Sequence, residues 1–234
     1  MSQNRFLAYI ITFISIIAII SFILSPFFQV RSIEFQGLKI LTQNDFNTVL
    51  NPYYNSNILF LDHRKMNKKI AKNKYVKNVD IIKNYPDTIM INIKEREPIA
   101  LISNNGEYVL FTVEGVIVEI DSDIKRVDVP EIKGLGYSLK NNDIFFSSIF
   151  EEIVQALDKI SVSARTHIKY ILYNEDQKLI SEINEGIKVY LGSPEYITKK
   201  FNILQSVITK INNEDLNVEY IDLSIYKKPV IKLK

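Results

Sequence analysis

Residues with catalytic potential are few in this chain and lie far apart. The only histidines, His63 and His167, lack the spacing of a metal-ligating pair. The absence of cysteine excludes disulfides, cysteine-based zinc sites and thiol nucleophiles. With 7 glycines there is little room for a phosphate-binding loop, and neither a G-x-S-x-G nor an H-E-x-x-H motif occurs. We therefore predict no catalytic, cofactor-binding or metal-binding residue and no enzymatic activity.

Charged clusters in the sequence favour solvated or structural roles. The Glu151-Glu152 pair is expected on the exterior of a helix. Glu95-Arg96-Glu97-Pro98 ends a predicted strand, so we interpret these charges as ion pairs that fix a boundary between two domains. Binding of nucleic acid or an acidic substrate is not expected, since the net charge is only +2. No small-molecule substrate is expected either, because the chain lacks catalytic and nucleotide-binding motifs. A solvated helix face, rather than a nucleic-acid or anionic-lipid site, explains the lysines at 65, 68, 69, 72, 74 and 77.

The last strand of the chain is the candidate site for a protein partner. A terminal strand has no successor in sequence to pair with, so it is expected at a sheet edge, where unpaired backbone groups can accept another strand. Lys227 and Lys228 would limit indiscriminate pairing and attract an acidic segment. Tyr226 either anchors the partner or packs on the sheet. The predicted partner-binding residues are Ser224, Ile225, Tyr226, Lys227, Lys228, Pro229, Val230 and Ile231.

An uncharged segment over residues 6–28 predicts a membrane-spanning helix. As a helix it would be about 34 Å long, enough to cross a hydrocarbon core of about 30 Å. A cleaved signal peptide is the alternative, but such peptides have a shorter apolar core and a small-residue cleavage site. Arg5 on one side and Arg31 with Lys39 on the other leave orientation undecided by charge. The predicted organisation is a tail at 1–5, the span at 6–28, and domains at 29–98 and 99–234.

The 29–98 region predicts a compact α+β module. Residues 30–35 alternate apolar and polar side chains, as in a half-buried strand. Thr42 begins a short helix, and Asp62 caps a second one that extends to about Lys72. Strands over 75–83 and 89–93 follow, so the order is strand, helix, helix, strand, strand, with the helices on one face of the sheet.

The 99–234 region predicts a mixed α/β domain with an extended antiparallel sheet. An Asn105-Gly106 turn joins two strands, and 129–134 is expected to be a connecting segment. An amphipathic helix is predicted over 143–160, and Ser193-Pro194-Glu195 is predicted to begin a second helix with Ser193 as its cap. Further strands are expected over 168–173, 178–183, 187–191, 218–223 and 229–233.

Several motifs together resemble the FtsQ/DivIB cell-division family. Its POTRA domain is similar to the run from Val30 to Gly37, to Asn57–Asp62, and to Tyr85-Pro86-Asp87 leading to Glu95-Arg96-x-Pro98. The second, β domain of the family resembles the segments 108–117, Val129-Pro130-x-Ile132-x-Gly134 and Tyr220-Ile221-Asp222-Leu223. Two residues depart from the pattern: Thr112 stands where the family usually has Asp, and Ser224 where many members have Arg.

The resemblance implies a bitopic scaffold of the cell-division machinery. It implies a short cytoplasmic tail, one span, and POTRA and β domains in the periplasm, at the division septum of the inner (plasma) membrane. The implied partners are FtsB and FtsL, with FtsB adding a strand to the β domain. The short tail and the end soon after the last strand resemble the FtsQ form more than the tail-extended DivIB form.

A second class of function is a POTRA-bearing component that transports or assembles β-strand proteins. Such a protein would continue into a membrane barrel of alternating lipid-facing strands. The sequence ends at Lys234 without such a pattern, so the division scaffold is the favoured interpretation.

Overall fold

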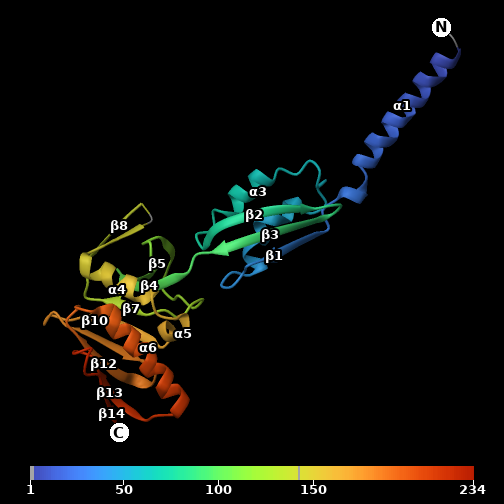
Figure 1. Cartoon of the computed structure of the whole chain (residues 1–234). Coiled ribbons are helices and arrows are strands. Elements are labelled where there is room, and N and C mark those ends of the chain that lie inside the picture. Colours follow the sequence, from blue (N-terminus) through green and yellow to red (C-terminus); the bar gives the residue numbers. More distant parts are fainter. Residues whose placement is uncertain (1–2, 142) are drawn as a thin grey trace. The chain divides into compact units, whose positions relative to one another are not determined.

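The computed structural model describes residues 3–141 and 143–234 (Figure 1). The described chain divides into two compact units, Met1–Arg96 and Glu97–Lys234. The first unit contains the N-terminal helix and a small sheet, and the second contains a large sheet with its helices. The domain limits 29–98 and 99–234 stay predictions.

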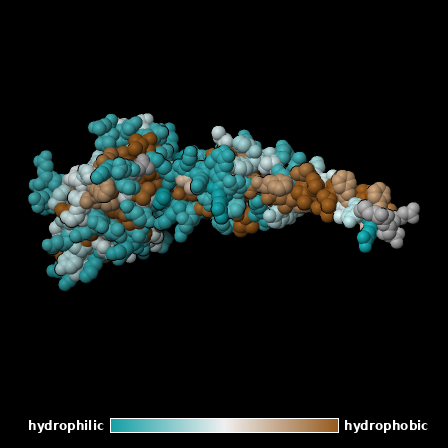
Figure 2. Space-filling view, turned by 90° about the horizontal axis from the view of Figure 1, so that it is seen from above, coloured by the Kyte–Doolittle hydropathy of each residue, from teal (hydrophilic) through white to brown (hydrophobic). Residues whose placement is uncertain are grey.

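The N-terminal helix α1, Gln3–Ile23, has the composition of a membrane-spanning segment. The candidate span Arg5–Phe28 has a mean hydropathy of 2.7 and none of it is buried within the protein. Figure 2 shows its hydrophobic surface at the right-hand end of the view. A 3-10 turn, η1 (Pro26–Phe28), follows the helix, and the Ser25 hydroxyl accepts the Phe27 N–H there.

The remainder of the first unit has the predicted strand-helix-helix-strand-strand order. Its three strands are arranged β1-β3-β2; β1 and β3 are parallel, and β2 and β3 are antiparallel. The first of the two predicted helices is a short composite of helical turns, and the second is α3, so the mixed α+β class is confirmed. The bounds are β1 Ser32–Gln36, η2 Gln43–Phe46, α2 Asn47–Leu50, η3 Asn51–Tyr53, α3 His63–Ile70, β2 Val76–Asn84 and β3 Thr88–Glu95.

Helix α3 packs on this sheet through its apolar face. Met66 and Ile70, four positions apart, are fully buried, while Lys65 and Lys68 are exposed and Lys69 is half-buried over the ring of Tyr53. Asp62 caps the helix by accepting the N–H groups of Arg64 and Lys65. The hydrogen bond from Lys65 stabilises the carboxylate and lowers the pKa of Asp62.

The carboxylate of Glu95 fastens the loop after β1 to the end of β3. It accepts the backbone N–H groups of Lys39 at 2.8 Å, Ile40 at 2.8 Å and Leu41 at 3.1 Å. Gly37, just before this loop, has φ +83° and lies against the carbonyl of Ile93. Glu95 therefore serves the first unit internally, and the prediction that it forms an ion pair at a domain boundary is wrong.

Nine strands form the mixed sheet of the second unit. Their order is β14-β13-β12-β11-β10-β7-β4-β5-β6. Most neighbours are antiparallel, but β12/β13, β7/β10 and β4/β7 are parallel, so the extended sheet is mixed. The bounds are β4 Pro98–Asn104, β5 Glu107–Thr112, β6 Ile117–Asp121, β7 Glu131–Lys133, β10 Ile168–Tyr173, β11 Leu179–Ile183, β12 Ile187–Gly192, β13 Val218–Asp222 and β14 Val230–Leu233.

Three helices pack on this sheet: α4 (Ser148–Asp158), α5 (Val162–Thr166) and α6 (Ile197–Glu214). The long helices α4 and α6 lie along the sheet in Figure 1. The core between them includes Phe150 and Phe201, both fully buried. Strands β11 and β12 largely alternate buried and less buried residues, as in a sheet with one covered and one solvated face, whereas β5 is buried throughout 109–112.

The structure corrects two predictions around α4. The predicted connecting segment 129–134 contains β7, which joins β4 to β10. The predicted helix over 143–160 begins only at Ser148, because Asp143–Phe146 is a strand, β9, paired with β8 (Tyr137–Lys140). Ile144 and Phe146 are two positions apart and both pack inward, which is the spacing of a strand, because residues two apart lie on nearly opposite sides of a helix.

The start of α6 also differs from the prediction. The cap is Tyr196, in a left-handed conformation with φ 59°, and Ser193 belongs to the preceding turn. The carbonyl of Ser193 instead accepts the ammonium of Lys200 at 2.6 Å. Lys200 is only 1% exposed, and burial lowers its pKa despite the opposing charge of Glu195.

A buried arginine links the residue just before β4 to the helices of the second unit. Arg165 is 4% exposed. Its guanidinium pairs with Glu97, lies 3.9 Å from Asp158 and donates to the carbonyl of Leu157 at 3.5 Å. Glu97 thus forms the expected ion pair, but with a residue of its own unit. The exposed carboxylates let the arginine be buried without an unpaired charge.

Candidate functional site

Strand β14 is one edge of the nine-stranded sheet, where the sequence predicts the partner-binding segment. It pairs with β13 in antiparallel register, with Tyr220 opposite Lys232 and Asp222 opposite Val230. On its other side, no strand of the described residues pairs with it. Alternate backbone groups of β14 are therefore accessible to another chain.

The hydrogen-bond pattern identifies the outward backbone groups. The N–H of Leu223 donates to the carbonyl of Tyr190 in β12. Because the backbone N–H groups of successive strand residues point to opposite sides, those of Tyr220 and Asp222 face β14. Their partners Val230 and Lys232 consequently point inward, as does Lys234, which donates to Asn217. The N–H and C=O groups of Ile231, between them, point away from the sheet.

The loop before β14 carries an aromatic cluster. The rings of Tyr226 and Tyr196 lie 4.8 Å apart. The ammonium of Lys199 lies 5.0 Å from the Tyr226 ring and 5.2 Å from the Tyr196 ring. Tyr196 is 58% exposed, and Ile225 nearby in sequence is 64% exposed. Tyr226 therefore packs on Tyr196, and the cluster presents aromatic surface to solvent, while the role of Tyr226 as an anchor for a partner stays a prediction.

Sequence reasoning did not identify Tyr196 and Lys199 as parts of this cluster. They lie at the start of α6 and meet Tyr226 only through the packing of α6 beside the end of the sheet. The left-handed conformation of Tyr196 is uncommon for a bulky residue and marks the site in the structure. Local patterns carry no signal for such a long-range contact.

The two edges of the sheet differ in charge. The β14 edge carries Lys227 and Lys228 in its loop and Lys232 in its strand. Lys232 forms a 3.1 Å ion pair with Glu219, and this hydrogen bond raises the pKa of Lys232. The opposite edge, β6, contains Glu119 and Asp121. An acidic strand would therefore favour β14 over β6.

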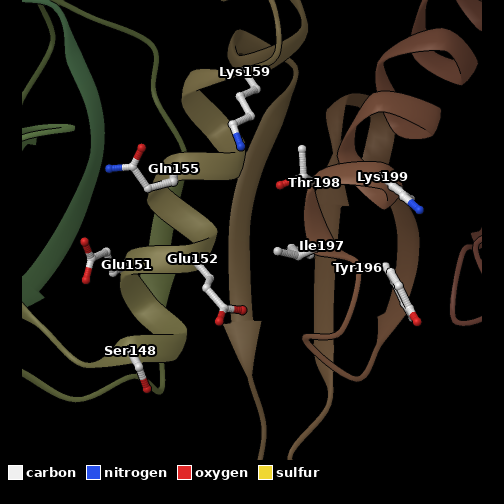
Figure 3. A pocket seen from close by; sticks show the side chains of 9 residues that line it. All are labelled: Ser148, Glu151, Glu152, Gln155, Lys159, Tyr196, Ile197, Thr198 and Lys199. Carbon is white, nitrogen blue, oxygen red and sulfur yellow. The ribbon is translucent and has the colours of Figure 1, made fainter.

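A groove of about 520 Å³ lies between α4 and the start of α6. Figure 3 shows Glu152 and Ile197 facing each other across it, while Tyr196 and Lys199 point outward. It is open, its surface is about equally polar and apolar, and its lining contains no histidine. Its residues are Ser148, Glu151, Glu152, Gln155, Lys159, Tyr196, Ile197, Thr198 and Lys199.

The two histidines lie in separate places. His63 begins α3 in the first unit. His167 lies in the second unit, where its ring nitrogens contact the carbonyl of Ser163 at 2.7 Å and the amide of Asn212 at 3.1 Å. Among residues 3–141 and 143–234, no group of three histidine or carboxylate side chains could hold a metal ion.

Comparison with known families identifies both parts of the chain. Residues 28–96 match the family described as "POTRA domain, FtsQ-type". Residues 100–224, more than half of the chain, match "Cell division protein FtsQ/DivIB, C-terminal". The chain belongs to the FtsQ/DivIB cell-division family. The resemblance inferred from the motifs is thereby confirmed.

Curated relatives carry both names of the FtsQ/DivIB family. Cell division protein DivIB of Clostridium acetobutylicum is 26% identical over 216 residues, covering 89% of this chain and 84% of the relative. Cell division protein FtsQ of Geotalea daltonii is 23% identical over 213 residues, covering 89% and 77%. The solved extracytoplasmic domain of DivIB from Geobacillus stearothermophilus, a trans isomer, matches 51% of this chain and 97% of that one, at 14% identity and a TM-score of 0.38.

Thr112, which departs from the FtsQ/DivIB pattern, occupies a buried turn position. It is 1% exposed, and its hydroxyl accepts the N–H of Val116 at 3.3 Å. Its carbonyl accepts the N–H of Gly115 at 2.9 Å. The Thr112 hydroxyl thus accepts a backbone hydrogen bond in the turn, as the carboxylate of an aspartate also can. The other departure, Ser224, is exposed at the start of the β14 loop, and its N–H donates to Asp222 at 2.8 Å.

Proposed function

We propose that this FtsQ/DivIB protein is a non-catalytic, single-pass scaffold of the division machinery. The observation that carries the proposal is the unpaired, basic β14 edge, with outward backbone groups at Ile231. Its proposed partners are FtsB, which adds a strand along β14, and FtsL. The scaffold holds these membrane proteins at the septum, where wall synthesis begins.

The tethered arrangement supports this role. With α1 in the inner (plasma) membrane and both domains in the periplasm, partners anchored in the same membrane meet β14 at a raised effective concentration. A scaffold of this kind needs no substrate pocket. The open groove beside α6 is consistent with a protein surface rather than an active site.

The orientation of the chain is tested by alkaline phosphatase fusions. Phosphatase fused after Lys234 is expected to be active, because the enzyme folds only outside the cytoplasm. Phosphatase fused before Phe6 is expected to be inactive. The reverse pattern would place β14 in the cytoplasm and contradict the proposed role, and immunoblots of both fusions control for expression.

The partner-binding role of the aromatic cluster is tested with Tyr226→Ala. We expect it to weaken binding of the FtsB extracytoplasmic domain by about 1–3 kcal/mol, roughly 5- to 150-fold, the range of a hot-spot residue. Isothermal titration of the purified proteins measures this change. Phe145→Ala is the matched control, since Phe145 is 55% exposed but lies in the separate β8–β9 sheet. Equal weakening by both variants would argue against this cluster as the docking site.

A further inference from the structure

The Tyr54–Phe60 loop, between η3 and α3, is bonded to the end of α1. The side-chain N–H₂ of Asn57 donates to the carbonyl of Ile23, the last residue of α1, at 2.7 Å. Its side-chain oxygen accepts the N–H of Leu59 at 2.9 Å, and its own carbonyl accepts the N–H of Phe60 at 3.2 Å. One side chain thus pairs a helix-end carbonyl that would otherwise lack a partner and also shapes the loop.

The connection from α1 into the first sheet is likewise paired with this loop. The carbonyl of Phe28 accepts the N–H of Ile58 at 2.8 Å. Val30 both donates to Ser56 at 2.9 Å and accepts from Asn55 at 3.0 Å. The segment between the span and β1 is therefore part of a hydrogen-bonded ladder rather than a free linker.

These bonds fix how far the loop can lie from the membrane if α1 crosses it. The candidate span ends at Phe28, which is bonded to Ile58. Phe60 follows two residues later, so its Cα is at most about 7 Å from that of Ile58. The headgroup region on each side of a bilayer is about 5–7 Å thick. The loop therefore lies at the depth of the headgroups.

The exposed side chains of the loop suit that depth. Phe60 is 67% exposed and Tyr54 41% exposed, whereas Ile58 between them is fully buried. The ammonium of Lys83 lies 3.5 Å from the carbonyl of Leu59 and adds a cation beside the loop. Tyrosine and lysine are typical anchors at membrane–water interfaces, and phenylalanine is among the apolar residues that interfacial segments bury at the headgroup boundary.

We propose that the Tyr54–Phe60 loop is a membrane-interface contact, with Phe60 inserted among the lipid headgroups of the bilayer that α1 crosses. The occupant of this exposed apolar surface is lipid because α1 holds the loop against the bilayer through Ile23 and Phe28. The contact gives the first sheet a second attachment to the membrane, in addition to the span. This inference goes beyond partner binding at β14, although it requires that α1 cross a bilayer.

The absence of tryptophan from the chain allows a direct test. Phe60→Trp places a single tryptophan in the full-length protein, where it can be excited selectively over the tyrosines; the protein is reconstituted in vesicles of phosphatidylcholine brominated at defined acyl positions. We expect blue-shifted emission that loses most of its intensity with bromine near the headgroup end of the chain, and less with bromine near the methyl end. Phe13→Trp, in the middle of α1, is expected to show the opposite depth preference.

Phe145→Trp provides the aqueous control, because this exposed phenylalanine belongs to the second unit. Phe60→Trp can share the emission wavelength and the resistance to quenching of Phe145→Trp while Phe13→Trp is quenched. That result would overturn the loop contact but leave the membrane span supported. Blue-shifted but unquenched emission at position 60 would mean that protein covers the loop. That result would also overturn the proposed lipid contact. Failure of quenching at position 13 would overturn both the span and the contact.

Discussion

Gly37→Ala is expected to destabilise the FtsQ-type POTRA domain by about 3–4 kcal/mol, a large part of the stability of a small domain. Gly37 has φ +83°, where an L-residue with a side chain costs about 1–2 kcal/mol. A Cβ at this position would also lie 2.1 Å from the carbonyl oxygen of Ile93. Because that oxygen belongs to β3, the backbone must move, and the loop held by Glu95 moves with it.

Hydrogen–deuterium exchange of the full-length protein in detergent measures this loss. Amides of β1 and β3 are expected to lose protection, while those of β10–β12 keep it. Gly106→Ala is the matched control, since Gly106 has φ +87° but no atom within 4 Å of an added Cβ. It is expected to cost only about 1–2 kcal/mol, the conformational part alone. Equal losses in the two variants would mean that the close approach to Ile93 is unimportant.

Ile231→Pro is expected to reduce binding of the proposed partner, FtsB, by at least tenfold more than Ile231→Ala does. The N–H of Ile231 points away from β13, so proline removes a donor that an added strand would use while the existing sheet bonds remain. The proline ring also obstructs the approach of the partner backbone. A lost hydrogen bond and this obstruction together exceed the roughly 1.4 kcal/mol that corresponds to tenfold.

The alanine variant is the control for this experiment because Ile231 also packs against the core. Both variants lose that packing, so their difference in titration reports the lost backbone donor together with the obstruction by the proline ring. Circular dichroism of both establishes that the domain is folded. If proline and alanine bind partner equally, strand addition does not occur at Ile231, and the aromatic cluster or another surface must carry the interaction.

Much of the fold was predictable because local patterns and tertiary packing agree. The alternation of apolar and polar residues predicted the strands around Ile91 and Val189, and the capping residue Asp62 predicted the start of α3. Predictions failed where a short strand directly precedes a helix or where a contact is non-local. Ile144 and Phe146 have the two-residue spacing of a strand, but they lie just before the helical pattern that begins at Ile149. The helix start predicted at Ser193-Pro194 is replaced by a turn in which the carbonyl of Ser193 binds buried Lys200.

The candidate site was predictable in position but not in composition. A last strand with lysines before it indicates an edge, and β14 is at one. The partners of Tyr226, however, come from α6, and no spacing rule connects Tyr196 with a residue in the final loop. The dual role of Asn57 was equally hidden, because its acceptor at Ile23 is defined only once the helix and loop are placed together.

The three-residue strand β7 has a consequence for how the large sheet forms. On one side of it, β4, β5 and β6 follow one another as hairpins, and on the other, β10, β11 and β12 do the same. Each set closes short loops and can form early. Glu131, by contrast, pairs with Leu101 and Tyr170, each at least 30 residues away in sequence. We expect β7 to dock late, as the step that converts two local hairpin sets into one cooperative sheet.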